Sequence, residues 1–171
     1  MTNLGSPSLE YQLSYRIYMD ICCLNRPFDD LEQERIRLEA EAILWILQRC
    51  QNRQWSLVNS NALEFELEKT SNREKVEQVA SLLALAQTRI DSDEGIEARV
   101  EVLIGMGFKF YDALHIAFAE AANVDIMLTT DDRLLRRALR CKKELKVTVE
   151  NPVMWLTNVI QLTIGEDNDT N

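Results

Sequence analysis

Short apolar segments alternate with longer helical patterns along most of this chain, and this alternation constrains the fold more than any other feature. Strands are predicted at 15–19, 55–58, 125–130 and 147–149, from apolar runs rich in aromatic and β-branched residues. Helices are predicted at 31–51, 63–67, 72–90, 93–106, 111–123 and 132–141, and residues 25–30 are predicted to form a loop. Strands that alternate with helices predict an α/β fold with a parallel sheet covered by helices.

The length of 171 residues and the absence of a repeat or linker predict one domain, over residues 15–160. Residues 1–14 show no hydrophobic period and are predicted to form a flexible N-terminal arm, and 161–171 a polar disordered tail. No apolar run approaches the length of a membrane span, and the N-terminus lacks the pattern of a signal peptide. We therefore expect no membrane contact and a cytoplasmic location.

The charge and the scarcity of histidine limit the chemistry. With 19 Lys and Arg against 28 Asp and Glu, the formal net charge is −9, so a nucleic acid would have to bind through a local basic rim or through cations. His115 is the one histidine, which excludes a zinc site built from several histidines. The four cysteines lack the CxxC spacing of zinc or redox motifs. Any chemistry therefore falls to the carboxylates.

Acidic residues follow the predicted strands or begin predicted helices. Asp20 comes directly after the first strand, and Asp131 and Asp132 come directly after the third. Asp112 begins a helix, and Glu66 lies in the short helix after the second strand. Because ligands of open parallel sheets bind beyond the carboxyl ends of the strands, these acids are predicted to meet at one edge.

Such a cluster has a physical cost that suggests a ligand. Two carboxylates about 4 Å apart repel by about 4 kcal/mol at an effective dielectric constant of about 20. Hard divalent cations such as Mg²⁺ and Mn²⁺ prefer oxygen ligands and keep waters of their own. A site of this kind suits the hydrolysis of phosphodiesters, because the metal activates water and neutralises charge on the phosphate.

Each acid also has an ordinary structural interpretation. Asp20 is typical of a turn, Asp112 complements a helix dipole, and Asp131 and Asp132 are typical of a helix N-cap. Glu66 stands between Glu64 and Glu68, a spacing that also describes a solvated acidic face. The joint placement of the acids, rather than any one of them, favours a site.

The order of these motifs resembles the PIN-domain family. The matching segments are a strand that ends in Asp, a Ser-containing turn followed by Glu–Leu, an Asp–Ala helix start and a Thr-x-Asp after a strand. They read Ile17–Tyr18–Met19–Asp20, Ser60 through Glu66–Leu67, Asp112–Ala113–Leu114–His115 and Leu128–Thr129–Thr130–Asp131–Asp132. The resemblance covers most of the chain, from Tyr15 to Leu156, and Asn25 also matches a polar residue usual near the first Asp.

The resemblance implies a three-layer α/β/α fold and a metal-dependent ribonuclease that prefers single strands, often the toxin of a toxin–antitoxin pair. It implies Asp20, Glu66, Asp112 and Asp131 as catalytic acids that bind Mg²⁺ or Mn²⁺. Asp132 is the alternative to Asp131, and Glu64 the alternative to Glu66. Partners implied by the family are an RNA substrate, an antitoxin protein and a second copy in a homodimer.

Further residues are predicted to support such a site. Asn25, Ser60 and Thr130 would hydrogen-bond around the acids, and His115 lies one turn beyond Asp112, either as a hydrogen-bond partner or as a packing residue. Arg26, Lys109 and Arg133 are the predicted nucleic-acid rim. A dense basic cluster follows at 133–143, which a solvated helix face also explains.

Two other functional classes share parts of this sequence pattern. A PIN-like module that binds nucleic acid or protein without cutting would keep the fold with an incomplete set of ligands. A phosphatase of the haloacid dehalogenase type needs a second Asp two residues after the first, and Cys22 occupies that position.

Overall fold

The computed structural model describes residues 14–168, with side chains described up to residue 162. The strands are β1 (Arg16–Met19), β2 (Ser56–Ser60), β3 (Thr88–Ile90), β4 (Ile126–Leu128) and β5 (Val149–Glu150). The first helices are α1 (Ile21–Asn25), the 3₁₀ turn η1 (Arg26–Phe28), α2 (Glu34–Gln51), α3 (Asn61–Glu68) and α4 (Arg73–Leu83). They are followed by α5 (Glu94–Gly105), α6 (Phe110–Ala121), α7 (Asp132–Arg140) and α8 (Pro152–Asn168).

All neighbouring strands of the sheet are parallel, in the order β3-β2-β1-β4-β5. The chain moves from β1 outward to β2 and β3, then crosses to β4 on the other side of β1 and continues to β5. The boundary between β1 and β4 is therefore the topological switch point, where open α/β sheets bind their ligands. Met19 is level with Leu128 across this boundary, which places Asp20 level with Thr129.

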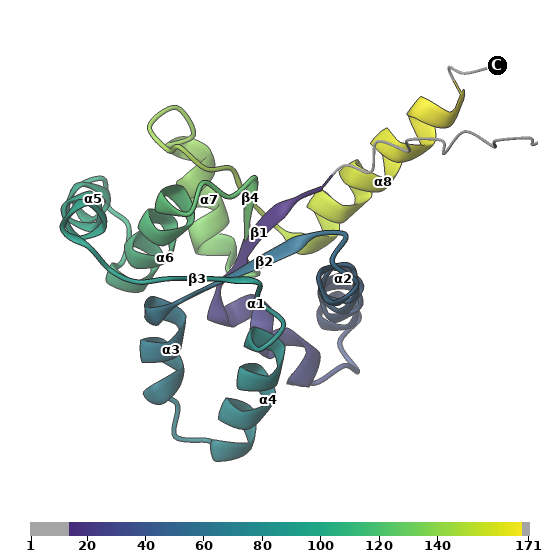
Figure 1. Cartoon of the computed structure of the whole chain (residues 1–171), viewed down its shortest axis with the longest axis horizontal. Helices are drawn as coiled ribbons and strands as arrows, with labels where there is room; N and C mark the ends of the chain where they lie inside the picture. The colour runs from purple at the N-terminus through teal and green to yellow at the C-terminus, as the bar shows by residue number, and fades with distance from the viewer. Residues whose placement is uncertain (1–13, 169–171) are drawn as a thin grey trace, which may run out of the picture.

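Helices cover both faces of the sheet, so the predicted three-layer α/β/α fold is confirmed. Figure 1 shows α2 and α8 on one side of the strands and α5, α6 and α7 on the other. The central strand β1 is covered on both faces, since Ile17, Tyr18 and Met19 are completely buried. This burial explains why β1 is a continuous apolar run rather than an alternating one.

Two segments differ from the sequence prediction. Residues 88–90 form β3 beside β2, although the helical pattern of 72–86 runs on toward them without a breaker. Pairing with β2 overrides that local pattern, and Gln87 helps by accepting a hydrogen bond from the Leu57 N–H (2.8 Å). Residues 25–28, predicted as part of a loop, instead form the end of α1 and the turn η1. Asp20 caps α1, which begins immediately after β1.

The ends of the chain also differ from the prediction. The backbone of α8 is helical to Asn168, whereas a disordered tail is predicted from residue 161. Residues 169–171 and most of the predicted arm, residues 1–13, lie outside the described residues. Among the described residues, every helix is too short or too polar to cross a membrane.

Candidate active site

Asp20 and Asp131 lie on the two sides of the switch point. Asp20 follows β1 and caps α1, where its carboxylate accepts a hydrogen bond from the Cys23 N–H (2.9 Å). Asp131 follows β4 and caps α7, where its carboxylate accepts a hydrogen bond from the Arg133 N–H (2.8 Å). Each acid thus acts as a helix cap, its ordinary structural role, and also stands where the fold places a ligand site.

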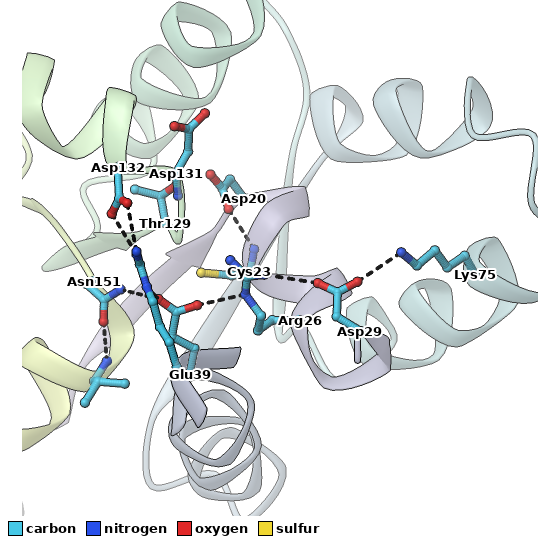
Figure 2. A network of polar contacts seen from close by, with 12 residues as sticks. Asp20, Cys23, Arg26, Asp29, Glu39, Lys75, Thr129, Asp131, Asp132 and Asn151 are labelled. Carbon is cyan, nitrogen blue, oxygen red and sulfur yellow. Dashed lines mark hydrogen bonds and ion pairs between the residues drawn. The ribbon is translucent and has the colours of Figure 1, made fainter. Parts of the chain in front are cut away.

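Thr129 lies beside Asp131 in Figure 2 and acts on both acids. Its hydroxyl accepts a hydrogen bond from the Asp131 N–H (3.1 Å), and a side-chain hydrogen bond from Thr129 lowers the pKa of Asp20 against the larger raising effect of burial. The sequence predicts this hydrogen-bonding role for Thr130 instead. Thr130 Oγ1 is buried and makes no hydrogen bond within the described residues.

Asp112 and Glu66 approach the same region from two other helices. Asp112 lies in the first turn of α6, and Glu66 lies in α3, which Ser60 caps at the end of β2. The charge of Asp131 raises the pKa of Asp112, after the larger effect of burial, and the charge of Glu66 contributes in the same direction to the raised pKa of Asp20.

The thiol of Cys22 shows that all four acids share one neighbourhood. Partial burial raises its pKa to about 12, and the charges of Asp20, Asp131, Glu66 and Asp112 each raise it further, in that order. Four carboxylates from four different segments thus lie within electrostatic range of this one side chain. They are the four acids that the sequence predicts for the site.

The titration of these acids differs because their surroundings differ. Burial raises the pKa of Asp20 to about 6 from its ordinary value of 3.8. Burial acts in the same direction on Asp131, but the backbone and guanidinium of Arg133 hold the pKa of this carboxyl below its usual range. The fold therefore disfavours the ionised form of Asp20 but favours that of Asp131.

A buried chain of hydrogen bonds holds Glu66. His115 Nε2 lies 2.6 Å from Glu66 Oε2, and His115 Nδ1 lies 2.8 Å from the Tyr18 hydroxyl. The Tyr18 hydroxyl also lies 2.8 Å from Ser60 Oγ. His115 is a hydrogen-bond partner at the site, one of the two roles left open for it. The sequence analysis missed Tyr18, although its two-residue spacing from Asp20 in an extended segment indicates the same side of the sheet.

The alternative acids are engaged elsewhere. Arg35 binds Asp132 through two hydrogen bonds of 2.8 and 2.6 Å, which turns Asp132 toward α2. Arg89 binds Glu64 through two hydrogen bonds of 2.9 and 2.8 Å, and these lower its pKa. These contacts favour Asp131 over Asp132 and Glu66 over Glu64 as site residues.

A second polar network, absent from the sequence analysis, lies below Asp20 in Figure 2. Its centre is Glu39, a carboxylate only 2% exposed, which pairs with Arg26 (2.8 Å) and Arg35 (3.0 Å). Asn151 donates a hydrogen bond to the same carboxylate (2.9 Å). Glu39 lies on the buried face of an otherwise charged segment of α2, and no local signal distinguishes it from its exposed neighbours.

The three residues predicted for the nucleic-acid rim differ in their surroundings. Arg26 is mostly buried and pairs with Glu39 and Asp29, so it is a structural cation rather than a free rim residue. Lys109 and Arg133 are exposed beside the acids, and both act to lower the pKa of Asp112 against the effect of burial. Asn25, at the end of α1, has a buried side-chain oxygen that makes no hydrogen bond within residues 14–168.

The donor set suits Mg²⁺ or Mn²⁺ in its chemistry, because it consists of carboxylates. Within residues 14–168, however, no three Asp, Glu, His or Cys side chains lie close enough together to hold a metal ion. Glu66 is drawn toward His115 and Asp131 toward Arg133, so the four carboxylates surround one region without converging on one point.

Comparisons with known proteins agree with this fold. The family model described as PIN domain matches residues 28–139. A solved structure, PAE2754 from Pyrobaculum aerophilum, is 14% identical with a TM-score of 0.52, over 87% of this chain and 99% of that chain. VapBC2 from Rickettsia felis, solved bound to a DNA fragment from its promoter, is 13% identical with a TM-score of 0.47, over 80% of this chain and 98% of that chain. No curated protein matches the sequence.

Proposed function

The chain belongs to the PIN-domain family, and from this premise we propose that it is a metal-dependent endoribonuclease that hydrolyses phosphodiester bonds of single-stranded RNA. The observation that supports the proposal is that carboxylates from four segments lie within electrostatic range of Cys22, beside the switch point between β1 and β4. Their caps and hydrogen bonds explain each acid singly but not the concentration of like charges in one region, where they repel one another. A divalent cation relieves that repulsion.

Asp20, Asp112, Asp131 and Glu66 would hold the metal. Bound there, Mg²⁺ or Mn²⁺ supplies a water activated for attack and positive charge at the scissile phosphate. The protein's own groups orient the acids around it. Thr129 and the Cys23 N–H direct the carboxylate of Asp20, and His115 directs that of Glu66.

His115 also connects Glu66 to the sheet. Its Nε2 lies against the Glu66 carboxylate and its Nδ1 against the Tyr18 hydroxyl, and that hydroxyl lies against Ser60 Oγ. Every polar group of this buried chain then has a partner. His115 therefore fixes the position of the Glu66 carboxylate as a candidate metal ligand.

The family also supports a biological setting for this activity. We propose that the chain is the toxin of a type II toxin–antitoxin pair, that it acts on RNA in the cytoplasm as a homodimer, and that an antitoxin protein restrains it. RNA cleavage before and after the removal of any co-purifying protein, with size-exclusion chromatography for the oligomeric state, tests this setting separately from the chemistry.

The test of the chemistry is cleavage of an end-labelled single-stranded RNA by the purified protein, with Mn²⁺ and with EDTA. We expect cleavage that requires Mn²⁺ and falls by at least about a hundredfold in Asp112→Asn, since removal of one stabilising group at the reaction centre has effects of this size. A contaminating nuclease would leave the cleavage unchanged in the variant.

Two matched pairs of variants test the assignment of the acids. Glu66→Gln is compared with Glu64→Gln in the same helix, and Asp131→Asn with the adjacent Asp132→Asn. We expect the first member of each pair to lose cleavage and the second to retain it, because Arg89 and Arg35 already bind the second. Loss in the second members alone would reverse the assignment.

Calorimetry with Mn²⁺ supplies a readout other than activity. Binding that disappears in the Asp20→Asn, Asp112→Asn double variant supports the acids as ligands. Neither binding nor cleavage by the wild-type protein would instead support the alternative, a PIN-like module that binds nucleic acid or protein without cutting.

A further inference from the structure

The basic residues of this acidic protein are concentrated in one short segment. Seven of the 19 Lys and Arg lie within residues 133–146, together with a single acidic residue, Glu144. The rest of the chain is correspondingly more acidic than the net charge of −9 suggests. Most of these cations belong to α7, whose N-cap is the site residue Asp131.

The arginines of α7 share one face of the helix. At about 100° per residue, Arg133, Arg136, Arg137 and Arg140 fall within about 100° of the helix circumference. Leu134 and Ala138 point away from this arc and are buried. We call these four arginines the arginine face.

The arginine face is largely free of acidic partners. Among the described residues, its one carboxylate partner is Asp131, which lies 3.4 Å from the guanidinium of Arg133. Arg136 and Arg140 are exposed, and the hydrogen bond between them runs from Arg140 Nε to the Arg136 carbonyl (3.2 Å). These guanidinium groups are therefore available to an external anion.

The arginine face continues to the edge of the acidic site. The guanidinium of Arg137 packs against Gly107, where a Cβ would lie 3.1–3.2 Å from its atoms and where φ is +90°. Glycine at this position lets the connection between α5 and α6 lie directly on α7, and Lys109 follows two residues later at the start of α6. Lys109 and Arg133 thus stand where the arginine face meets Asp112 and Asp131.

A solvated helix face explains this arrangement only in part. The helix dipole favours cations in the last turn of α7, which accounts for Arg137 and Arg140. It disfavours a cation in the first turn, where Arg133 lies. An anionic ligand that spans the whole helix accounts for all four.

We infer that the arginine face of α7, together with Lys109, binds the phosphodiester backbone of single-stranded RNA and leads it to the four carboxylates. This inference rests on the proposed function. Arginine suits the role because its planar guanidinium binds phosphate through two parallel hydrogen bonds. The nine residues of α7 extend over about 14 Å, which leaves room for more than one phosphate.

The test measures binding of a fluorescent 20-nucleotide RNA by anisotropy, in an Asp112→Asn background that prevents cleavage. The variant Arg136→Ala, Arg140→Ala changes only exposed side chains away from the carboxylates. We expect it to bind about tenfold more weakly at low salt, and the slope of log affinity against log salt to fall by about 1.4, since each phosphate contact to a single strand contributes about 0.7.

The matched control is Arg37→Ala, Arg73→Ala, which removes the same charge from exposed positions of α2 and α4. We expect its affinity to stay within about twofold of the parent. Unchanged binding by the arginine-face variant would overturn the inference. An equal loss in the control would also overturn it, because net charge rather than this surface would then govern binding.

A second arm separates this inference from the proposed function. Hydrolysis of bis(4-nitrophenyl) phosphate with Mn²⁺, in the protein that keeps Asp112, requires the acids but not a long basic surface. We expect the arginine-face variant to hydrolyse this small diester normally while it cleaves the 20-mer about tenfold more slowly. If nothing is cleaved, the proposed function fails, and the binding arm still decides the inference.

Discussion

The two ends of the same parallel sheet are built on opposite principles. At the amino ends of β1 and β2, Tyr15 and Trp55 pack edge to face with ring centroids 5.4 Å apart, and Trp155 of α8 packs on both. At the carboxyl ends of β1 and β4, Asp20 and Asp131 lie in the same region as Asp112 and Glu66, and all four charges act on Cys22. The aromatic rings at the amino end attract one another, whereas the carboxylates at the carboxyl end repel one another.

The side chains at the aromatic end make favourable aromatic and cation–π contacts with one another. Trp45 packs edge to face on Trp55 at 5.7 Å, and the guanidinium of Arg49 lies 4.2 Å from the centre of a Trp45 ring. Such contacts add stability beyond the burial of apolar area. The difference indicates that stabilising contacts are concentrated at one end of the sheet, while the acids at the other end repel one another.

The largest expected effect comes from the aromatic end. Trp55→Ala is expected to lower the free energy of unfolding by about 4 kcal/mol, because a buried indole leaves a large cavity. Chemical denaturation followed by circular dichroism measures this loss, with Trp55→Phe as the control that keeps a smaller ring. RNA cleavage per folded molecule at low temperature is expected to stay within about twofold of the wild type. Loss of cleavage without loss of stability would show that the two ends are not separable.

Asp20→Asn is expected to raise the free energy of unfolding of the metal-free protein, whereas Trp55→Ala lowers it. The folded pKa of Asp20 is raised to about 6, so between about pH 4 and 6 the unfolded chain loses this proton before the folded protein does. The free energy of unfolding therefore falls as pH rises through this window, by about 2 to 3 kcal/mol in total. Asn keeps the N-cap and carries no charge, so the metal-free variant is expected to be more stable at pH 8 by about this amount.

Thermal unfolding at pH 8 and at pH 4 measures this effect. We expect a rise of about 5 °C or more in Tm at pH 8 and a much smaller rise at pH 4, where Asp20 of the wild-type protein is protonated in the folded state and about half protonated in the unfolded state. Asp30→Asn, at an exposed loop position, is the control and should change neither Tm. A lower Tm for Asp20→Asn at pH 8 would mean that the carboxylates do not repel as the structure indicates.

The smallest expected effect concerns the orientation of Glu66. His115→Gln keeps a donor near the position of Nε2, whereas His115→Asn keeps a polar group near Nδ1, which faces Tyr18. Each variant loses about one buried hydrogen bond, so a similar destabilisation of about 1 kcal/mol is expected. Only His115→Asn should weaken Mn²⁺ binding and lower kcat with little change in KM. Equal Mn²⁺ affinity for the two variants would assign His115 to packing alone.

Much of the site can be predicted from the sequence because its acids follow local signals. Asp20 and Asp131 each end an apolar strand and cap the next helix, and Asp112 stands in a first helical turn, all of which are visible in a few consecutive residues. The choice between Glu66 and Glu64 is not visible there. It depends on whether His115 or Arg89 lies opposite, and both partners come from distant segments.

The sequence by itself determined the alternation of strands and helices, the α/β class and the acids at the strand ends, since periodicity and caps act over a few residues. Only the tertiary structure decided that β1 lies beside β4, that β3 replaces the end of a predicted helix, and that Glu39 is buried among Arg26, Arg35 and Asn151. The physical reason is that strand order and the pairing of buried charges depend on the packing of segments far apart in the chain. Local propensity carries no record of which distant side chain will lie opposite.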